Sequence, residues 1–189
     1  DSEEDTWNMD PILLEEAILY QISVSKKPKA IILVHLYGYP AKIDEIINIA
    51  KKYDIPIVED AAEALGSRYK NKPLGCFGTI GIYSFNGNKI ITTSSGGAIL
   101  SRDSKIIEKA RFLSTQARDK QPHYEHSEIG YNYRMSNVCA AIGLGQLEVL
   151  EKRVEKRRFI YDFYTRELSS IKEINFLEEL PGFFSNRWL

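Results

Sequence analysis

The pattern of apolar and polar residues predicts a strand, a helix and a second strand in the first third of the chain. Residues 29–36 form a continuous apolar run rich in isoleucine and valine, which is typical of a parallel strand covered on both faces. Residues 42–53 place apolar side chains at helical spacing, and residues 55–58 are apolar again. This order predicts a right-handed crossover, with the first strand central in its sheet and ligands beyond the carboxyl ends of the strands.

The same periodicities predict further elements. Asp10 followed by Pro11 is typical of a helix start, because an aspartate caps the free amide groups and proline fits the first helical position. Additional strands are expected over residues 79–85 and 97–101, and a helix over residues 104–115. The chain is therefore expected to be an α/β fold with a mainly parallel sheet.

A long helical tract is predicted over residues 137–168. Its basic cluster at 153–158 is interpreted as a solvated helix face. The sequence pattern changes after this helical tract. We therefore expect residues 1–168 to be part of a large domain that includes the connecting helix, and residues 169–189 to begin a smaller domain that is truncated.

Composition narrows the classes of function. The formal net charge of -1 gives no electrostatic footprint for nucleic acid or for an anionic membrane. The longest apolar run is far too short to span a bilayer. Cys76 and Cys139 lie far apart and form no C-x-x-C pattern, so a reducing cytoplasm is the expected location. The chain opens on Asp1 without a secretory leader, and we expect it to be part of a longer protein.

Residues 57–97 hold side chains suited to a pyridoxal phosphate site. Lys89 lies among small polar residues, and a lysine amine can bond covalently to the cofactor's aldehyde. Asp60 follows an apolar run, where a carboxylate could hold the proton on the ring nitrogen. Ala62 leaves space for a flat ring, and Ser84 offers a hydroxyl to the phosphate. On this chemistry alone, a solvated loop lysine and an aspartate that caps a turn are equally good interpretations.

The segment over residues 116–129 is polar and irregular. It contains His123, Glu125 and His126, a spacing that can suggest a metal site. A third ligand and a helical frame are missing, so no metal site is expected and a loop facing a partner is the favoured interpretation.

Several segments together resemble a known enzyme family. VEDAAEALGS and YSFNGNKIITTSSGG, with HLYGYP before them and GYNYRMS after them, are similar to the signature blocks of the DegT/DnrJ/EryC1/StrS sugar aminotransferases. The likeness covers nearly the whole chain, in order and with matching spacing. It implies the fold type I (aspartate aminotransferase-like) large domain of pyridoxal phosphate enzymes. The family's early phosphate-binding segment and most of its small domain have no counterpart, so we expect that this piece alone could be inactive.

The resemblance assigns roles to individual residues. Lys89 matches the lysine that bonds to the cofactor, Asp60 the partner of the pyridine nitrogen, and Ala62 the residue against the ring. Glu63 matches the position that reaches the ring hydroxyl, although glutamine or histidine is common there and a carboxylate beside that oxygen is repulsive unless protonated or turned toward substrate. Ser84 matches the phosphate contact.

Asn132 matches the asparagine that reaches the neighbouring subunit's phosphate, which implies a homodimer with composite sites. Asn132 could instead cap the helix that follows it, and Ser84 could simply bond within its strand. Both interpretations are kept open.

The resemblance is strongest to bacterial enzymes that aminate UDP-4-keto-6-deoxy-N-acetylglucosamine in the bacillosamine pathway of glycan biosynthesis. It implies transamination of a nucleotide-linked keto sugar with glutamate as the donor. The alternatives are a GDP-4-keto-6-deoxymannose (perosamine) aminotransferase and a noncatalytic family member. A sugar dehydratase of the same family is disfavoured, because those relatives carry histidine where Lys89 stands.

Overall fold

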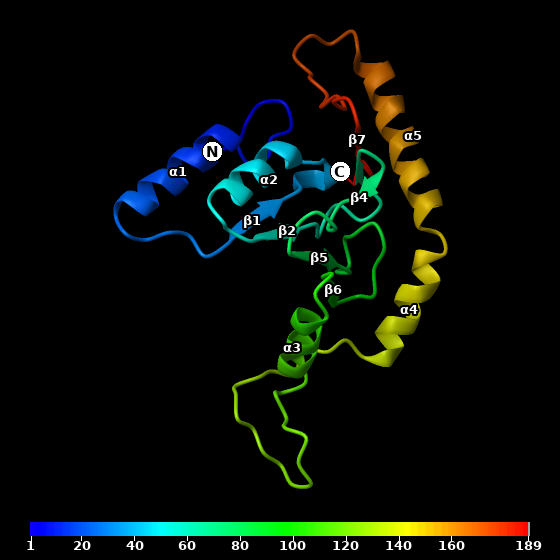
Figure 1. The fold of residues 1–189 in the computed structure, drawn as a ribbon. Coiled ribbons are helices and arrows are strands. Elements are labelled where there is room, and N and C mark those ends of the chain that lie inside the picture. The colour runs from blue at the N-terminus through cyan, green and yellow to red at the C-terminus, as the bar shows by residue number, and fades with distance from the viewer. Residues whose placement is uncertain (189) are drawn as a thin grey trace.

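The structure, a computed structural model, describes residues 1–188 and is built on a four-stranded sheet in the order β1-β2-β5-β6. Its strands are β1 (Ile31–Val34), β2 (Ile57–Asp60), β5 (Ile80–Ser84) and β6 (Gly97–Leu100). The first three are parallel, and β6 is antiparallel to β5. Figure 1 shows this sheet at the centre of the chain. The predicted α/β fold with a mainly parallel sheet is confirmed.

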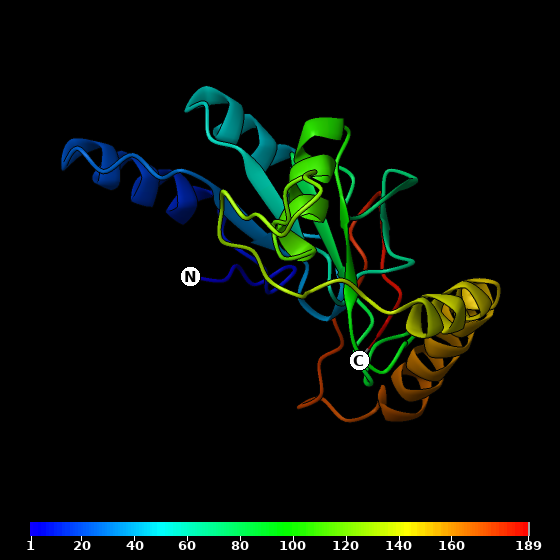
Figure 2. The ribbon, with the colours of Figure 1, turned by 90° about the horizontal axis from the view of Figure 1, so that it is seen from below.

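Two helices cover one face of β1 and β2. Helix α1 (Pro11–Ser23) begins where Asp10 accepts hydrogen bonds from the amides of Ile12 and Leu13, and α2 (Ile43–Lys52) packs beside it. Figure 2 shows both helices on the same side of the sheet. Both contribute apolar side chains to one core cluster. The cluster consists of Ile18, Ile31, Leu33, Ala41, Ile46, Ala50, Ile55 and Ile57. Helix α3 (Ser104–Ser114) follows β6 and contacts it.

The other face of the sheet is open within the described residues, which corrects the prediction for the first strand. Strand β1 is an edge strand, and its side chains alternate between buried and exposed, with Ile32 61% and Val34 40% exposed. The register aligns Val34 with Asp60 and Asp60 with Ile82, so these side chains form one row across the open face. An apolar run in the sequence predicts a strand with two apolar faces. It does not show which part of the protein covers the second face.

The predicted helix over residues 137–168 is broken into α4 (Asn137–Leu147) and α5 (Leu150–Leu168). The two residues between them are neither proline nor glycine, so no local signal marks the break. After it, Leu150 and Val154 pack in a cluster with Trp188. A straight helix would follow one axis throughout, and the break lets α5 turn this apolar pair onto the cluster. Tertiary packing therefore decides the geometry.

A second, three-stranded sheet joins the end of the chain to its middle. Strand β3 (Arg68–Tyr69) pairs with both β4 (Lys72–Pro73) and β7 (Phe183–Phe184). Asn186 is fully buried, and its amide donates hydrogen bonds to the carbonyls of Glu63 and Leu65. The proposed division of the chain at residue 169 stays a prediction. Within residues 1–188, no helix combines the length and apolar character needed to cross a bilayer.

Candidate active site

Lys89 lies on the connection between β5 and β6, and its side chain is enclosed. Its ammonium nitrogen is 3.6 Å from Oε1 of Glu63 and 4.5 Å from the centre of the Trp188 ring. Only 14% of the Lys89 side chain is exposed. Such a residue is not a solvated loop lysine, so that alternative interpretation is wrong.

Glu63 is held in place by a strained turn, η1 (Leu36–Gly38). Its Oε2 accepts a hydrogen bond of 2.7 Å from the amide of Tyr37, a residue with φ of 55°. Gly38 follows with φ of 75°, and a β-carbon there would lie 2.1 Å from Oδ1 of Asn186. The backbone of the turn therefore fixes one carboxylate oxygen of Glu63 and leaves the other facing Lys89.

Asp60 and Ser84 end two neighbouring parallel strands on the open face of the sheet. In the register, Asp60 aligns with Ile82, and Ser84 lies two residues further on the same face. Oδ1 of Asp60 accepts a hydrogen bond of 3.1 Å from the amide of Ala62, so the carboxylate fixes the backbone of the residue expected to face the ring. The hydroxyl of Ser84 accepts a hydrogen bond of 3.3 Å from the amide of Asn86.

Asn132 makes its backbone contacts in another part of the chain than Lys89, Asp60 and Ser84. It forms an isolated antiparallel β-bridge with Thr115. Figure 1 shows the segment beyond α3 extending away from the sheet and returning toward α4. No hydrogen bond within residues 1–188 joins Asn132 to Lys89, Asp60 or Ser84. The cap of α4 is Ser136, whose hydroxyl accepts a hydrogen bond from the amide of Cys139, so the interpretation of Asn132 as that cap is wrong. Its contribution to a neighbouring site stays a prediction.

The basic cluster of α5 is not the uniformly solvated face that its sequence predicts. Arg158 pairs with Glu179, donates to the carbonyl of Ser185 and lies 4.3 Å from the centre of the Phe184 ring. Burial raises the pKa of the Glu179 carboxyl, but hydrogen bonds from Arg158 and the Ser185 amide outweigh burial and hold this pKa below its ordinary value. The three remaining cations of the cluster line a pocket together with Lys89.

The loop between α3 and α4 contains the two histidines with possible metal-site spacing. His123 lies 3.3 Å from the carboxylate of Glu125, and their side chains are 71% and 51% exposed. In the part of the chain that the structure describes, no group of three His, Cys, Asp or Glu side chains could hold a metal ion.

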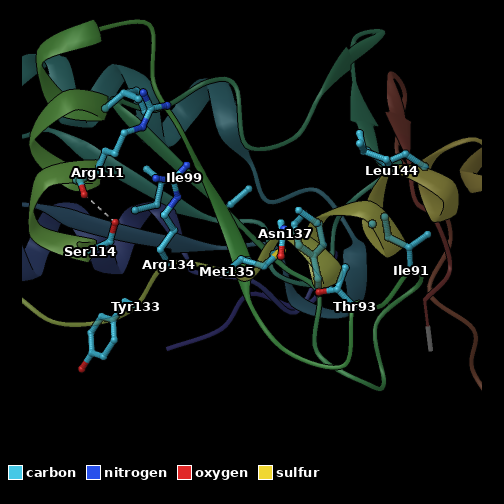
Figure 3. Close-up of a pocket in the computed structure, with 18 residues that line it drawn as sticks. Ile91, Thr93, Ile99, Arg111, Ser114, Tyr133, Arg134, Met135, Asn137 and Leu144 are labelled. Atoms are coloured by element: carbon cyan, nitrogen blue, oxygen red, sulfur yellow. Dashed lines mark hydrogen bonds between the residues drawn. The ribbon is translucent and has the colours of Figure 1, made fainter. Parts of the chain in front are cut away.

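A large apolar pocket of about 770 Å³ lies between β6, α3 and α4. Figure 3 shows Ile99, Met135 and Leu144 along it, with Arg111 and Arg134 at one end. Lys89, Asp60 and Glu63 do not line it. This apolar pocket is therefore separate from the candidate chemistry.

Comparison with known proteins identifies the family. The model of the DegT/DnrJ/EryC1/StrS aminotransferase family matches residues 1–182. The chain belongs to this family. It is 54% identical over 189 residues to EpsN of Bacillus subtilis (strain 168), which carries the name of a pyridoxal phosphate-dependent aminotransferase, and covers 49% of that protein.

Two further relatives support membership of this family. A GDP-perosamine synthase of Escherichia coli O157:H7 is 39% identical over the whole chain, which covers 50% of it. A DegT DnrJ EryC1 StrS aminotransferase from Brucella abortus has a solved structure that matches with a TM-score of 0.92 and 31% identity, over 100% of this chain and 50% of that one. The chain spans about half the length of the relatives it matches.

The residues of this family member suit pyridoxal phosphate, the cofactor of the family. Lys89 supplies an enclosed amine, and Asp60 supplies a carboxylate beside small side chains at the carboxyl end of a parallel strand. Ser84 supplies a neutral hydroxyl at the end of the next strand. An amine, a carboxylate and a hydroxyl are the three groups that an aldehyde, a pyridine nitrogen and a phosphate require.

A buried pair behind Asp60 was missed by sequence reasoning. Both oxygens of Glu59 accept from the amide of Phe77, at 2.9 and 3.1 Å, and the Glu59 side chain is fully buried. Nδ1 of His35 accepts from the Ala41 amide, and Nε2, which has no hydrogen-bond partner within the described residues, lies 3.9 Å from Oε2 of Glu59. The amide of His35 donates to the carbonyl of Asp60. The only sequence signal was a histidine and a glutamate at the ends of two predicted buried strands.

Proposed function

We propose that the full-length protein is a pyridoxal phosphate-dependent aminotransferase that moves an amino group from glutamate to a nucleotide-linked 4-keto-6-deoxy sugar for bacterial glycan biosynthesis. The observation that carries this proposal is the enclosed Lys89 amine beside Glu63, on the loop that follows the strand ending in Ser84. Membership of the aminotransferase family supports it.

In this proposal, the cofactor when bound acts as an electron sink for the carbon that loses its proton. Nζ of Lys89 would hold the cofactor and, when free, would take and return that proton as general base and acid. The Asp60 carboxylate would hold a proton on the ring nitrogen, and Ala62 would face the ring. Glu63, whose Oε1 lies 3.6 Å from Nζ of Lys89, would help to position that amine.

The substrate proposed first is UDP-4-keto-6-deoxy-N-acetylglucosamine, on the resemblance of the signature segments to bacillosamine-pathway enzymes. GDP-4-keto-6-deoxymannose is the second candidate, because a GDP-perosamine synthase is 39% identical over the whole chain. We also propose a homodimer in which Asn132 contacts the phosphate of the partner's cofactor. A noncatalytic family member would lack turnover on both sugars.

The test uses full-length protein and its Lys89→Ala variant, with Lys26→Ala in an exposed connector as the control. Turnover is followed by product mass on a panel of nucleotide 4-keto sugars, and cofactor attachment by the visible absorbance of the lysine-bound form. Lys89→Ala should lose both signals, while Lys26→Ala should keep them. Normal turnover in Lys89→Ala would reject the assignment, and wild-type protein without the absorbance band would favour the noncatalytic alternative.

A further inference from the structure

A basic pocket of about 390 Å³ lies between the loop that carries Lys89 and the helices α4 and α5. One wall is formed by residues 87–92, and the other by Gln146 of α4 and one face of α5. The charged side chains lining it are Lys89, Arg153, Lys156 and Arg157, and no carboxylate is among the lining residues. The pocket therefore places three cationic side chains of α5 around one space with Lys89, the proposed nucleophile.

The three cations of α5 that line the basic pocket lie on one face of the helix, and none of them is paired with a carboxylate in the described part of the chain. Residues 153, 156 and 157 are three and four positions apart, a spacing that directs side chains to the same side. Within residues 1–188, no carboxylate lies within 4.0 Å of Arg153, Lys156 or Arg157, whereas the adjacent Arg158 is paired with Glu179. Like charges gathered in this way repel one another, and a bound anion would relieve the repulsion.

We propose that this basic pocket binds the diphosphate of the nucleotide-linked substrate, an inference that rests on the function proposed above. Arginine binds phosphate oxygens through two parallel hydrogen bonds, and Arg153 and Arg157 supply two such groups one turn apart on α5. The diphosphate is bonded to C1 of the sugar, so the reacting C4 would lie across the sugar ring from the arginines, on the side of Lys89.

A neighbouring pocket favours a nucleotide over the dicarboxylate amino donor. This second pocket, of about 550 Å³, shares Arg157 and Ile160 with the basic pocket. It is rich in aromatic side chains, including Tyr37, Tyr161 and Tyr164, and the flat face of a base stacks well on such rings. A molecule with a base on one side of its diphosphate and a sugar on the other could span both pockets, whereas glutamate has no ring to place there.

The experiment measures binding of UDP, GDP and inorganic pyrophosphate to full-length protein by calorimetry. The variants are Arg153→Gln, Lys156→Gln and Arg157→Gln, with Lys152→Gln as a control that removes the same charge from α5 outside the pocket. Each pocket variant should weaken nucleotide binding about tenfold, in line with a lost charge-assisted hydrogen bond. Lys152→Gln should stay within about twofold of wild type, and added salt should reduce the difference between variants. Wild-type protein should bind UDP or GDP more tightly than pyrophosphate if the aromatic pocket receives the base.

Kinetics separate this inference from the proposed function. The pocket variants should raise KM for the nucleotide sugar while KM for glutamate and the absorbance of the lysine-bound cofactor stay unchanged. Unchanged nucleotide affinity in Arg153→Gln and Arg157→Gln, or a rise in KM for glutamate instead, overturns the pocket assignment while transamination by the wild type still stands. Nucleotide binding that depends on these residues in a protein without turnover supports the pocket and rejects the proposed function.

Discussion

Replacing Glu59 with alanine should destabilise the protein, because its fully buried carboxylate is the acceptor for the Phe77 amide. Its oxygens accept the Phe77 amide at 2.9 and 3.1 Å, whereas Nε2 of His35 lies 3.9 Å from Oε2, too far for a hydrogen bond. Truncation leaves the Phe77 N–H without this acceptor and opens a space beside the fully buried His35 side chain. An unsatisfied buried donor costs about 1–3 kcal/mol, and the space left by the truncated side chain adds to this, so the expected loss is about 2–4 kcal/mol.

The assay is urea unfolding of the full-length protein, with Glu59→Gln as the matched control. The glutamine carbonyl can still accept the Phe77 amide, so this variant should lose only about 1 kcal/mol. The free energy of unfolding is taken from the transition that reports on this domain. A loss below about 1 kcal/mol in Glu59→Ala, or equal losses in the two variants, would show that the buried acceptor is not what stabilises this region.

Two further changes test the ion pair on α5 and the turn beneath Glu63. Because the pKa of Glu179 is held below its ordinary 4.5, its stabilisation is present above that pH and is lost as pH falls through the lowered pKa. Glu179→Gln should therefore lower the free energy of unfolding by about 1–3 kcal/mol at pH 7. The difference from wild type should become progressively smaller below pH ~4.5, and a difference that does not change with pH would contradict the role of the Arg158–Glu179 pair. Gly38→Ala should lower thermal stability and weaken cofactor binding, since its β-carbon would lie 2.1 Å from Asn186 Oδ1, and unchanged cofactor affinity would contradict the role of this turn. Gly145→Ala is its control, because a β-carbon there meets nothing within 4 Å, and it should stabilise α4 by about 0.5–1 kcal/mol.

The elements of the fold were largely predictable, because local periodicity carries their signal. Asp10 and Pro11 marked a helix start that the structure contains, and the strands and helices between residues 31 and 114 occur close to their expected positions. The break between α4 and α5 was not predictable, because Glu148 and Val149 do not disfavour a helix. It depends on a contact between α5 and Trp188 that no local pattern reveals.

The sequence predicted which residues form the candidate site, but it did not predict the surroundings of their side chains. Lys89 and Asp60 were identified from the sequence, yet the groups that enclose Lys89 come from residues 26 positions before it and 99 after it, Glu63 and Trp188. Which cations of the α5 cluster face solvent and which face Lys89 depends on how α5 packs, and a charge run cannot reveal that. Distant packing converts an ordinary loop lysine into an enclosed one.

The most direct test of the central claim is to identify the residue that holds the cofactor. Full-length protein loaded with pyridoxal phosphate is treated with borohydride, which makes the lysine–cofactor bond permanent, and is then digested and mapped by mass spectrometry. The pyridoxyl group is expected on the peptide that contains Lys89, and it should be absent when the same treatment is applied to Lys89→Ala. A label on another lysine, or no label on protein that still transaminates, would contradict the account.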